Sequence, residues 1–241
     1  MIAIVRIILM GVFILLSTVI VLLVCLLRPR NIKNVHFAAQ LYSKIARLLG
    51  VKVTILGKEN ISSDSCVYVA NHQSNYDIFF LTAAVPPGTV SVGKKSIIYF
   101  PFFGLIYWLS GNIFIERGNK VKAMQSLLKA KDNMLKNNTS VWLFPEGTRN
   151  YGKGLRPFKT GAFHLARNAA LPVIPVAASN YYPDFKLNRL NNGEMIIEFL
   201  PALTKETITS LSVKDTVTTV YETMSEKINE LDRTLQQAES T

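Results

Sequence analysis

The chain has 241 residues, of which 49% are hydrophobic and 18% are charged. This apolar, charge-poor composition excludes a disordered chain, and 13 glycines with 10 prolines exclude a collagen-like one. The two cysteines, Cys25 and Cys66, are too few for a disulfide framework and are predicted to be buried thiols.

The formal net charge of +11 is concentrated near the start of the chain. Residues 1–58 contain eight basic side chains and no acidic one, whereas the remaining residues carry 19 basic and 16 acidic side chains. A basic surface can bind nucleic acid or anionic lipid. The same quarter contains the most apolar run of the chain, so we expect a phospholipid membrane as partner and no nucleic acid.

Residues 7–27 form an uncharged, apolar run. A helix of this length measures about 31 Å, which matches the hydrocarbon core of a bilayer. The alternatives are a buried soluble helix, which is rarely so long, and a signal peptide, whose apolar region is shorter and is followed by small residues. Arg28, Arg30 and Lys33 follow the run and weakly favour a cytoplasmic location for the rest of the chain.

Residues 35–49 place apolar side chains at helical spacing after the helix-breaking Pro29. Lys44 and Arg47 interrupt the apolar stripe, which predicts an amphipathic helix at the membrane interface. The alternative is an ordinary core helix of the following domain. We therefore expect membrane-anchoring helices in residues 1–50 and one α/β domain in residues 51–241.

From residue 51 onward, short apolar strands alternate with helical segments. Strands are predicted at residues 51–55, 66–70, 89–92, 112–115, 140–144, 173–176 and 194–200. Helices are predicted at residues 77–84, 120–135, 160–170 and 217–235. This alternation predicts an α/β fold with a largely parallel mixed sheet flanked by helices, preceded by the hydrophobic and amphipathic helices of the anchor.

Polar residues follow several of these strands, where open α/β sheets bind ligands. If His72 lies on a turn and Asp77 begins the next helix, the carboxylate can orient one ring nitrogen and leave the other as a general base. The alternative is a helix-capping Asp77 with a structural His72. There is no Gly-x-Ser-x-Gly motif and no cysteine beside His72, so we expect the base to activate a hydroxyl of the substrate.

Basic residues follow two other predicted strands. Arg149 is suited to hold a phosphate by two parallel hydrogen bonds, and Lys159 follows it. Glu146 either orients Arg149 or fixes backbone amides. Lys94 and Lys95 come after another strand. A solvated surface charge is the alternative for each cation alone, but their clustering after strands predicts an anionic headgroup as ligand.

Four ordered segments resemble the glycerolipid acyltransferase family with the HxxxxD motif, and most closely its bacterial members that acylate 1-acyl-sn-glycerol 3-phosphate. The resemblance runs from about residue 51 to residue 176. The matching segments are NHxxxxD at residues 71–77, GNIFIER at 111–117, FPEGTR at 144–149 and LPVIPV at 171–176.

The resemblance implies that His72 deprotonates the sn-2 hydroxyl of lysophosphatidic acid and that Asp77 holds its ring. It implies acyl-CoA or acyl carrier protein as donor, phosphatidic acid for phospholipid synthesis as product, and no cofactor, metal or acyl-enzyme. It implies the bacterial cytoplasmic membrane, with the catalytic domain on the cytoplasmic face and the N-terminal helices spanning or lying in one leaflet. The implied substrate-binding residues are Arg117, Glu146, Gly147, Thr148 and Arg149, with Lys94, Lys95 and Lys159 nearby.

Three other interpretations stay open at this point. A sister acyltransferase would use glycerol 3-phosphate or another lysolipid as acceptor. A non-catalytic membrane protein would bind lipid without transferring an acyl group. A zinc hydrolase is the third, and the three scattered histidines argue against it.

Overall fold

The computed structural model describes residues 1–116 and 118–239. Its core is a seven-stranded sheet with the strand order β1-β7-β6-β2-β5-β3-β4. Neighbouring strands are parallel except for β6 and β7, which confirms the predicted largely parallel mixed sheet. The strands are β1 Lys52–Leu56, β2 Val67–Ala70, β3 Thr89–Lys94, β4 Ile113–Ile115, β5 Ser140–Leu143, β6 Val173–Ala178 and β7 Glu194–Phe199.

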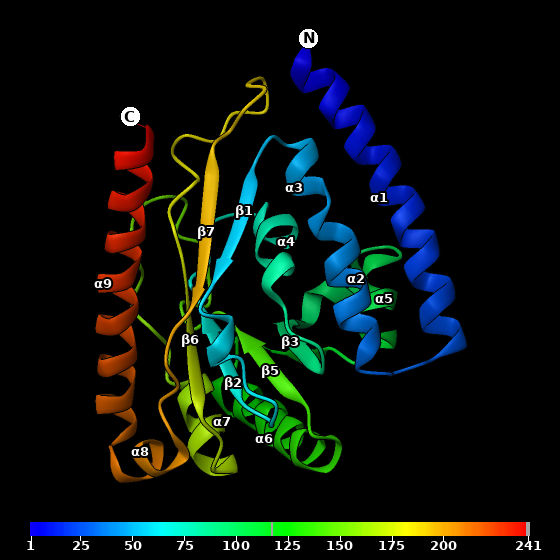
Figure 1. Ribbon diagram of the computed structural model, residues 1–241. Coiled ribbons are helices and arrows are strands. Elements are labelled where there is room, and N and C mark those ends of the chain that lie inside the picture. Colours follow the sequence, from blue (N-terminus) through cyan, green and yellow to red (C-terminus); the bar gives the residue numbers. More distant parts are fainter. Residues whose placement is uncertain (117, 240–241) are drawn as a thin grey trace.

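The central strands are apolar on both sides because helices cover both faces of the sheet (Figure 1). Along β2, Val67 and Val69 belong to one hydrophobic core, and Tyr68 and Ala70 belong to the other. The first core packs against α6 (Lys120–Asn137), α7 (Gly161–Ala169) and α9 (Val213–Glu239), with α8 (Lys205–Ser210) at its end. The second core, together with a smaller hydrophobic cluster that includes Ile106 and Leu109, packs against the helices on the other face. These helices are α2 (Lys33–Ser43), α3 (Ile45–Leu48), α4 (Asp77–Phe80) and α5 (Phe103–Leu109).

Helix α1 (Ile2–Leu27) lies alongside α2, α3 and α5 and is long and apolar enough to cross a membrane by length and composition (Figure 1). Most of its large apolar side chains are exposed, as a lipid-facing helix requires. Met10, Phe13 and Ile14 instead pack against the second core. One side of α1 therefore belongs to the protein, and the other side is free to contact lipid.

The N-terminal end of α1 is fixed to the body by Arg6, whose side chain is buried. Its guanidinium donates hydrogen bonds to the carbonyls of Leu48 at 2.9 Å, Leu187 at 3.0 Å and Leu190 at 2.7 Å. The carbonyl of Arg189 accepts a further one. A buried charge inside an apolar helix is tolerated because these carbonyls solvate it.

The apolar stripe of α2 faces the protein. Val35, Ala38, Ala39 and Tyr42 are buried, whereas Lys33 is exposed. This packing matches the alternative of a helix that belongs to the body. Whether α2 also lies at a membrane surface, and whether residue 50 is a domain boundary, stay predictions.

Candidate active site

The carboxyl ends of three neighbouring strands form the candidate site. Strand β2 lies between β5 and β6 and is parallel to both, so the loops that follow the three strands meet at one edge of the sheet. The side chain of Asn71 extends the β2–β6 pairing, since it donates to the carbonyl of Ala178 and accepts from its amide, each at 2.9 Å. This pairing fixes the start of the loop that carries His72.

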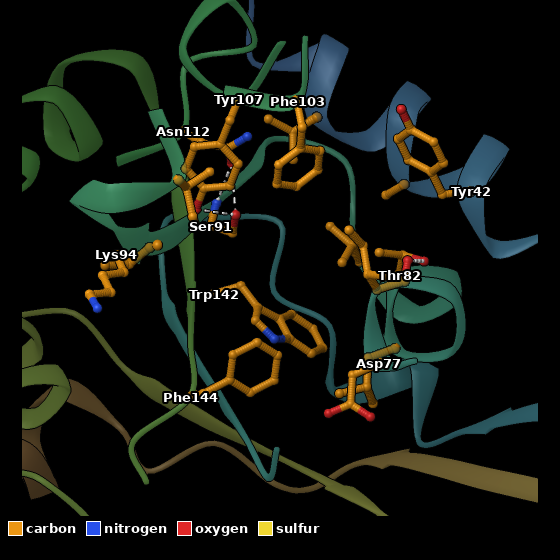
Figure 2. A pocket seen from close by; sticks show the side chains of 18 of the residues that line it. Tyr42, Asp77, Thr82, Ser91, Lys94, Phe103, Tyr107, Asn112, Trp142 and Phe144 are labelled. Carbon is orange, nitrogen blue, oxygen red and sulfur yellow. Dashed lines mark hydrogen bonds between the residues drawn. The ribbon is translucent and has the colours of Figure 1, made fainter. Parts of the chain in front are cut away.

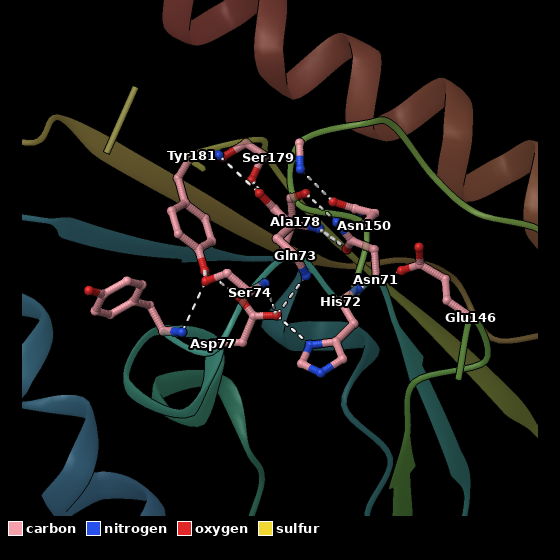
Figure 3. A network of polar contacts seen from close by, with 12 residues as sticks. Asn71, His72, Gln73, Ser74, Asp77, Glu146, Asn150, Ala178, Ser179 and Tyr181 are labelled. Carbon is pink, nitrogen blue, oxygen red and sulfur yellow. Dashed lines mark hydrogen bonds and ion pairs between the residues drawn. The ribbon is translucent and has the colours of Figure 1, made fainter. Parts of the chain in front are cut away.

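The predicted contact between the imidazole and the carboxylate is present. Helix α4 begins at Asp77, and the chain folds back so that Nδ1 of His72 lies 2.5 Å from Oδ2 of Asp77 (Figure 3). The same oxygen accepts the backbone amides of Gln73 at 2.7 Å and Ser74 at 3.3 Å. Asp77 is only 2% exposed, so these donors take the place of water around its carboxylate.

Tyr181 supplies a donor to the other carboxylate oxygen. Its hydroxyl lies 2.5 Å from Oδ1 of Asp77 and 2.7 Å from Oγ of Ser74 (Figure 3). Burial, and next the charge of Asp77, raise the pKa of Tyr181 well above its ordinary value. The hydroxyl therefore stays protonated and donates to Asp77.

The His72 ring is held on its face as well as on its edge. Phe144 stacks on it with ring centroids 4.1 Å apart and an angle of 15° between the planes. The His72 side chain is 15% exposed and lines a cavity. Because Nδ1 faces Asp77, Nε2 is the nitrogen available to a molecule bound in the cavity.

The cavity has a volume of about 640 Å³ and lies between α2, β3, α5 and the loops after β2 and β5. Its walls are mainly apolar, with Trp142 and Phe144 between Asp77 and a polar group at the far side (Figure 2). In that group, Ser91 Oγ lies 2.8 Å from the Tyr107 hydroxyl and donates to Oδ1 of Asn112 at 3.0 Å. The cavity thus offers apolar surface beside the imidazole.

Glu146 braces the loop behind His72. Its side chain is buried, and its two carboxylate oxygens accept the backbone amides of His72 at 2.6 Å and Arg156 at 3.0 Å. The structure thus gives Glu146 the second of its two expected roles, fixing backbone amides, and it is not among the described residues that line the cavity. Burial raises the pKa of Glu146 above its ordinary value, although the amides it accepts oppose this shift.

Three of the predicted substrate-binding residues, Lys94, Thr148 and Arg149, line the same cavity as His72. Nε of Arg149 is buried and has no hydrogen-bond partner among the residues that the structure describes. A buried donor without a partner is costly. Arg149 thus brings a guanidinium with one unsatisfied donor to the wall of the cavity.

Gly147, Lys95 and Lys159 are not among the described residues that line the cavity. Gly147 has a left-handed φ of 69°, and a Cβ there would lie 2.6 Å from Nζ of the exposed Lys159, so the glycine lets this side chain pack closely. Lys95 is exposed, with Nζ 3.9 Å from Glu116 on the edge of the sheet. Arg117 lies outside the described residues.

The described residues contain no group of three or more His, Cys, Asp or Glu side chains that would hold a metal ion. The expected independence of metals and cofactors stays a prediction.

Sequence reasoning missed Tyr181 and the aromatic partner of His72. Tyr181 follows β6, the neighbour of β2, and a search after every predicted strand would have reached it. Phe144 comes directly after β5, but its stacking on His72 depends on the strand order. The α5 wall of the cavity gave no periodic signal.

Together, the sheet edge, the oriented imidazole and the adjoining apolar cavity define an enzyme class in which a base activates the hydroxyl of a lipid-like substrate. The chain belongs to the acyltransferase family, because the family model described as Acyltransferase matches residues 52–179. This finding confirms the resemblance seen in the sequence.

Curated relatives cover most of the chain. The 1-acyl-sn-glycerol-3-phosphate acyltransferase of Salmonella typhimurium is 42% identical over 218 residues, which are 90% of this chain and 89% of the relative. The protein of the same name from Escherichia coli K12 is 41% identical over 217 residues, with the same coverage. The crystal structure of the 1-acyl-sn-glycerophosphate acyltransferase PlsC from Thermotoga maritima has the same fold, with a TM-score of 0.72, 23% identity, and coverage of 96% of this chain and 98% of that one.

Proposed function

We propose that the protein transfers a fatty acyl group from a thioester donor to the sn-2 hydroxyl of 1-acyl-sn-glycerol 3-phosphate and so forms phosphatidic acid for phospholipid synthesis. The observation that carries this proposal is the 2.5 Å contact between His72 and Asp77 at the wall of an apolar cavity that also includes Arg149. The names of the relatives with 41–42% identity support the same acceptor.

His72 acts as the general base in this reaction. Nε2 takes the proton of the acceptor hydroxyl as its oxygen attacks the thioester carbonyl carbon, and Asp77 stabilises the imidazolium that forms. When the tetrahedral intermediate collapses, the carbon–sulfur bond breaks and the leaving thiolate takes the proton from His72. The reaction needs no acyl-enzyme, metal ion or cofactor.

Arg149, with Lys94 and Thr148, binds the phosphate of the acceptor. The support is the position of these three residues in the cavity wall and the unpaired, buried Nε of Arg149. A guanidinium binds phosphate with a geometry that an ammonium group lacks. Arg117, Gly147, Lys95 and Lys159 remain proposed contributors to this site, whereas Glu146 supports it through backbone amides.

The donor is acyl-CoA or acyl carrier protein, and the apolar part of the cavity takes an acyl chain. Trp142, Phe144 and Tyr42 are among its lining residues, and such walls suit a hydrocarbon chain. Side-by-side assays with the two thioesters, at equal acyl chain length, separate the donors.

The enzyme works at the bacterial cytoplasmic membrane, with the catalytic domain on the cytoplasmic face. Support comes from exposed apolar side chains on α1 and from exposed Tyr99, Phe100 and Phe102. The two surfaces adjoin, because Leu15 and Phe102 line one groove. An apolar surface of this extent is typical of a lipid-binding face.

An acceptor panel with one radiolabelled acyl donor tests the proposed function. We expect labelled phosphatidic acid with 1-acyl-sn-glycerol 3-phosphate and far less product with glycerol 3-phosphate or with a lysolipid that lacks a phosphate monoester. Preference for another acceptor would replace the proposed substrate. Absence of acyl transfer to every acceptor would favour a lipid-binding protein and contradict the proposal.

A further inference from the structure

We propose that Tyr181 is a positioning residue of the acyl transfer reaction, which holds the Asp77 carboxylate in the orientation that His72 requires. The inference rests on the proposed function and names a residue that no motif of the sequence includes. The two carboxylate oxygens of Asp77 have different partners, since Oδ2 faces His72 and Oδ1 faces Tyr181 (Figure 3).

The two carboxylate oxygens differ in their support. Oδ2 accepts from His72 and from the amides of Gln73 and Ser74, all on the same short loop. The donor to Oδ1 is the hydroxyl of Tyr181, 104 residues away in sequence, at 2.5 Å. Without this donor, Oδ1 would be a buried anionic oxygen whose lost hydrogen bond disfavours the observed orientation of the carboxylate.

Tyr181 is itself fixed by neighbouring groups. Its backbone amide donates to Oε1 of Gln73 at 3.1 Å, and Nε2 of Gln73 donates to the carbonyl of Ser179 at 2.7 Å. Its ring packs edge-on against Phe80, with centroids 4.8 Å apart. The ring therefore has little freedom, and the hydroxyl arrives at Asp77 in a set position.

The C-terminal helix secures the loop that carries Tyr181. Asp232 on α9 accepts the backbone amide of Asn180 at 2.7 Å through Oδ1 and its side-chain amide at 2.6 Å through Oδ2. A carboxylate that receives two donors from one residue fixes that residue firmly. A continuous series of contacts thus runs from Asp232 through Asn180 and Tyr181 to Asp77 and His72.

The test compares Tyr181→Phe with Tyr68→Phe in detergent-solubilised full-length protein. Tyr68 is a buried tyrosine of the same second core, but it lies within β2 and its ring contacts Trp142 and Phe199. We expect Tyr181→Phe to lower kcat about tenfold, the effect of one hydrogen bond to a charged group, and to leave the KM for the lysolipid within about twofold. Tyr68→Phe should leave both constants nearly unchanged.

A second background shows whether Tyr181 acts through Asp77. In an Asp77→Asn protein the carboxylate is absent, so adding Tyr181→Phe should change kcat by less than about twofold. Asp232→Asn should lower kcat in the same direction as Tyr181→Phe, by a smaller factor, with KM unchanged.

Three results would overturn the inference: an unchanged kcat for Tyr181→Phe, an equal loss for Tyr68→Phe, or a full tenfold loss in the Asp77→Asn background. These results leave the proposed function intact as long as the wild-type protein forms phosphatidic acid. A wild-type protein without acyl transfer activity would overturn both.

Discussion

At the scale of single residues, the site is organised around two buried carboxylates with different roles. Asp77 faces the His72 ring, whereas Glu146 accepts the backbone amide of the same histidine. Burying a carboxylate is unfavourable unless donors surround it. Each carboxylate has such donors, so side chain and backbone of His72 are both held from within the protein.

We expect the buried Glu146 to make the free energy of unfolding depend on pH. Burial raises its pKa above the ordinary value of 4.5, so between these two pKa values the native state binds more protons than the unfolded chain. The contribution of this group to the free energy of unfolding is therefore largest below pH 4.5 and decreases as the pH rises through the raised pKa.

Urea denaturation of the wild-type protein and of Glu146→Gln measures this dependence. We expect the difference in unfolding free energy, wild type minus variant, to fall as the pH is raised from about 4 to about 8. The exposed Glu222→Gln serves as a matched control without such a trend. A difference that stays constant or increases with pH would contradict the account of Glu146.

We expect substitution of Arg149 to weaken binding of the acceptor. Its buried Nε has no partner among the described residues, and loss of a charge-assisted hydrogen bond costs about 1.5–3 kcal/mol. We expect Arg149→Ala to raise the KM for 1-acyl-sn-glycerol 3-phosphate about 10- to 100-fold, with a smaller change in kcat. Lys153→Ala, which removes an exposed cation, is the control. An unchanged acceptor KM in Arg149→Ala would make the phosphate assignment wrong.

At the scale of elements, the strands and long helices were predictable because their apolar pattern reports burial directly. Strand β2 is apolar on both faces and α6 has one apolar side, and both lie where the sequence predicts them. Helix α5 was not predicted, because its seven residues, FGLIYWL, are apolar or aromatic all round and show no helical period. Helix α8 was missed since six residues are too few to show one.

The candidate site was predictable only in part, for reasons that lie in the strand order. His72 and Asp77 are only five residues apart, so the sequence offered their contact as one of two alternatives, which depended on a turn at His72. Tyr181 approaches Asp77 because β6 lies next to β2, and a single sequence does not reveal which strands are neighbours. The same limit applies to Glu146, whose contact with the His72 amide bridges 74 residues.

We expect the attachment of helix α1 to the rest of the protein to depend on Arg6. Arg6→Met replaces the charged side chain by an unbranched apolar one and leaves the carbonyls of Leu48, Leu187 and Leu190 without this donor. Because each unsatisfied buried group costs about 1–3 kcal/mol, we expect unfolding free energy to fall by about 3 kcal/mol or more. The control is Arg28→Met at the exposed end of α1. Equal stability of the two variants in urea denaturation would contradict the role of Arg6.

At the scale of the whole molecule, one face of the sheet combines the features that acyl transfer at a membrane requires. Helix α1 lies on the side of the sheet that carries α2–α5 (Figure 1). Residues of α2 and α5 also line the cavity with His72, and the exposed Tyr99, Phe100 and Phe102 come directly before α5. The helices α6, α7 and α9 support the opposite face. Under the proposed function, a lipid acceptor would meet the cavity on the same side of the sheet as α1.

The most direct measurement is the rate of labelled phosphatidic acid formation from 1-acyl-sn-glycerol 3-phosphate by the wild-type protein, His72→Ala and His164→Ala, each in membranes and at equal protein amount. His164 lies on α7, on the opposite face of the sheet, and is the matched control. Removal of a general base lowers the rate about 10²–10⁴-fold. We therefore expect the rate of His72→Ala to fall by a factor in this range and the rate of His164→Ala to match the wild type. A His72→Ala protein that stays membrane-bound, folded and fully active would contradict the account.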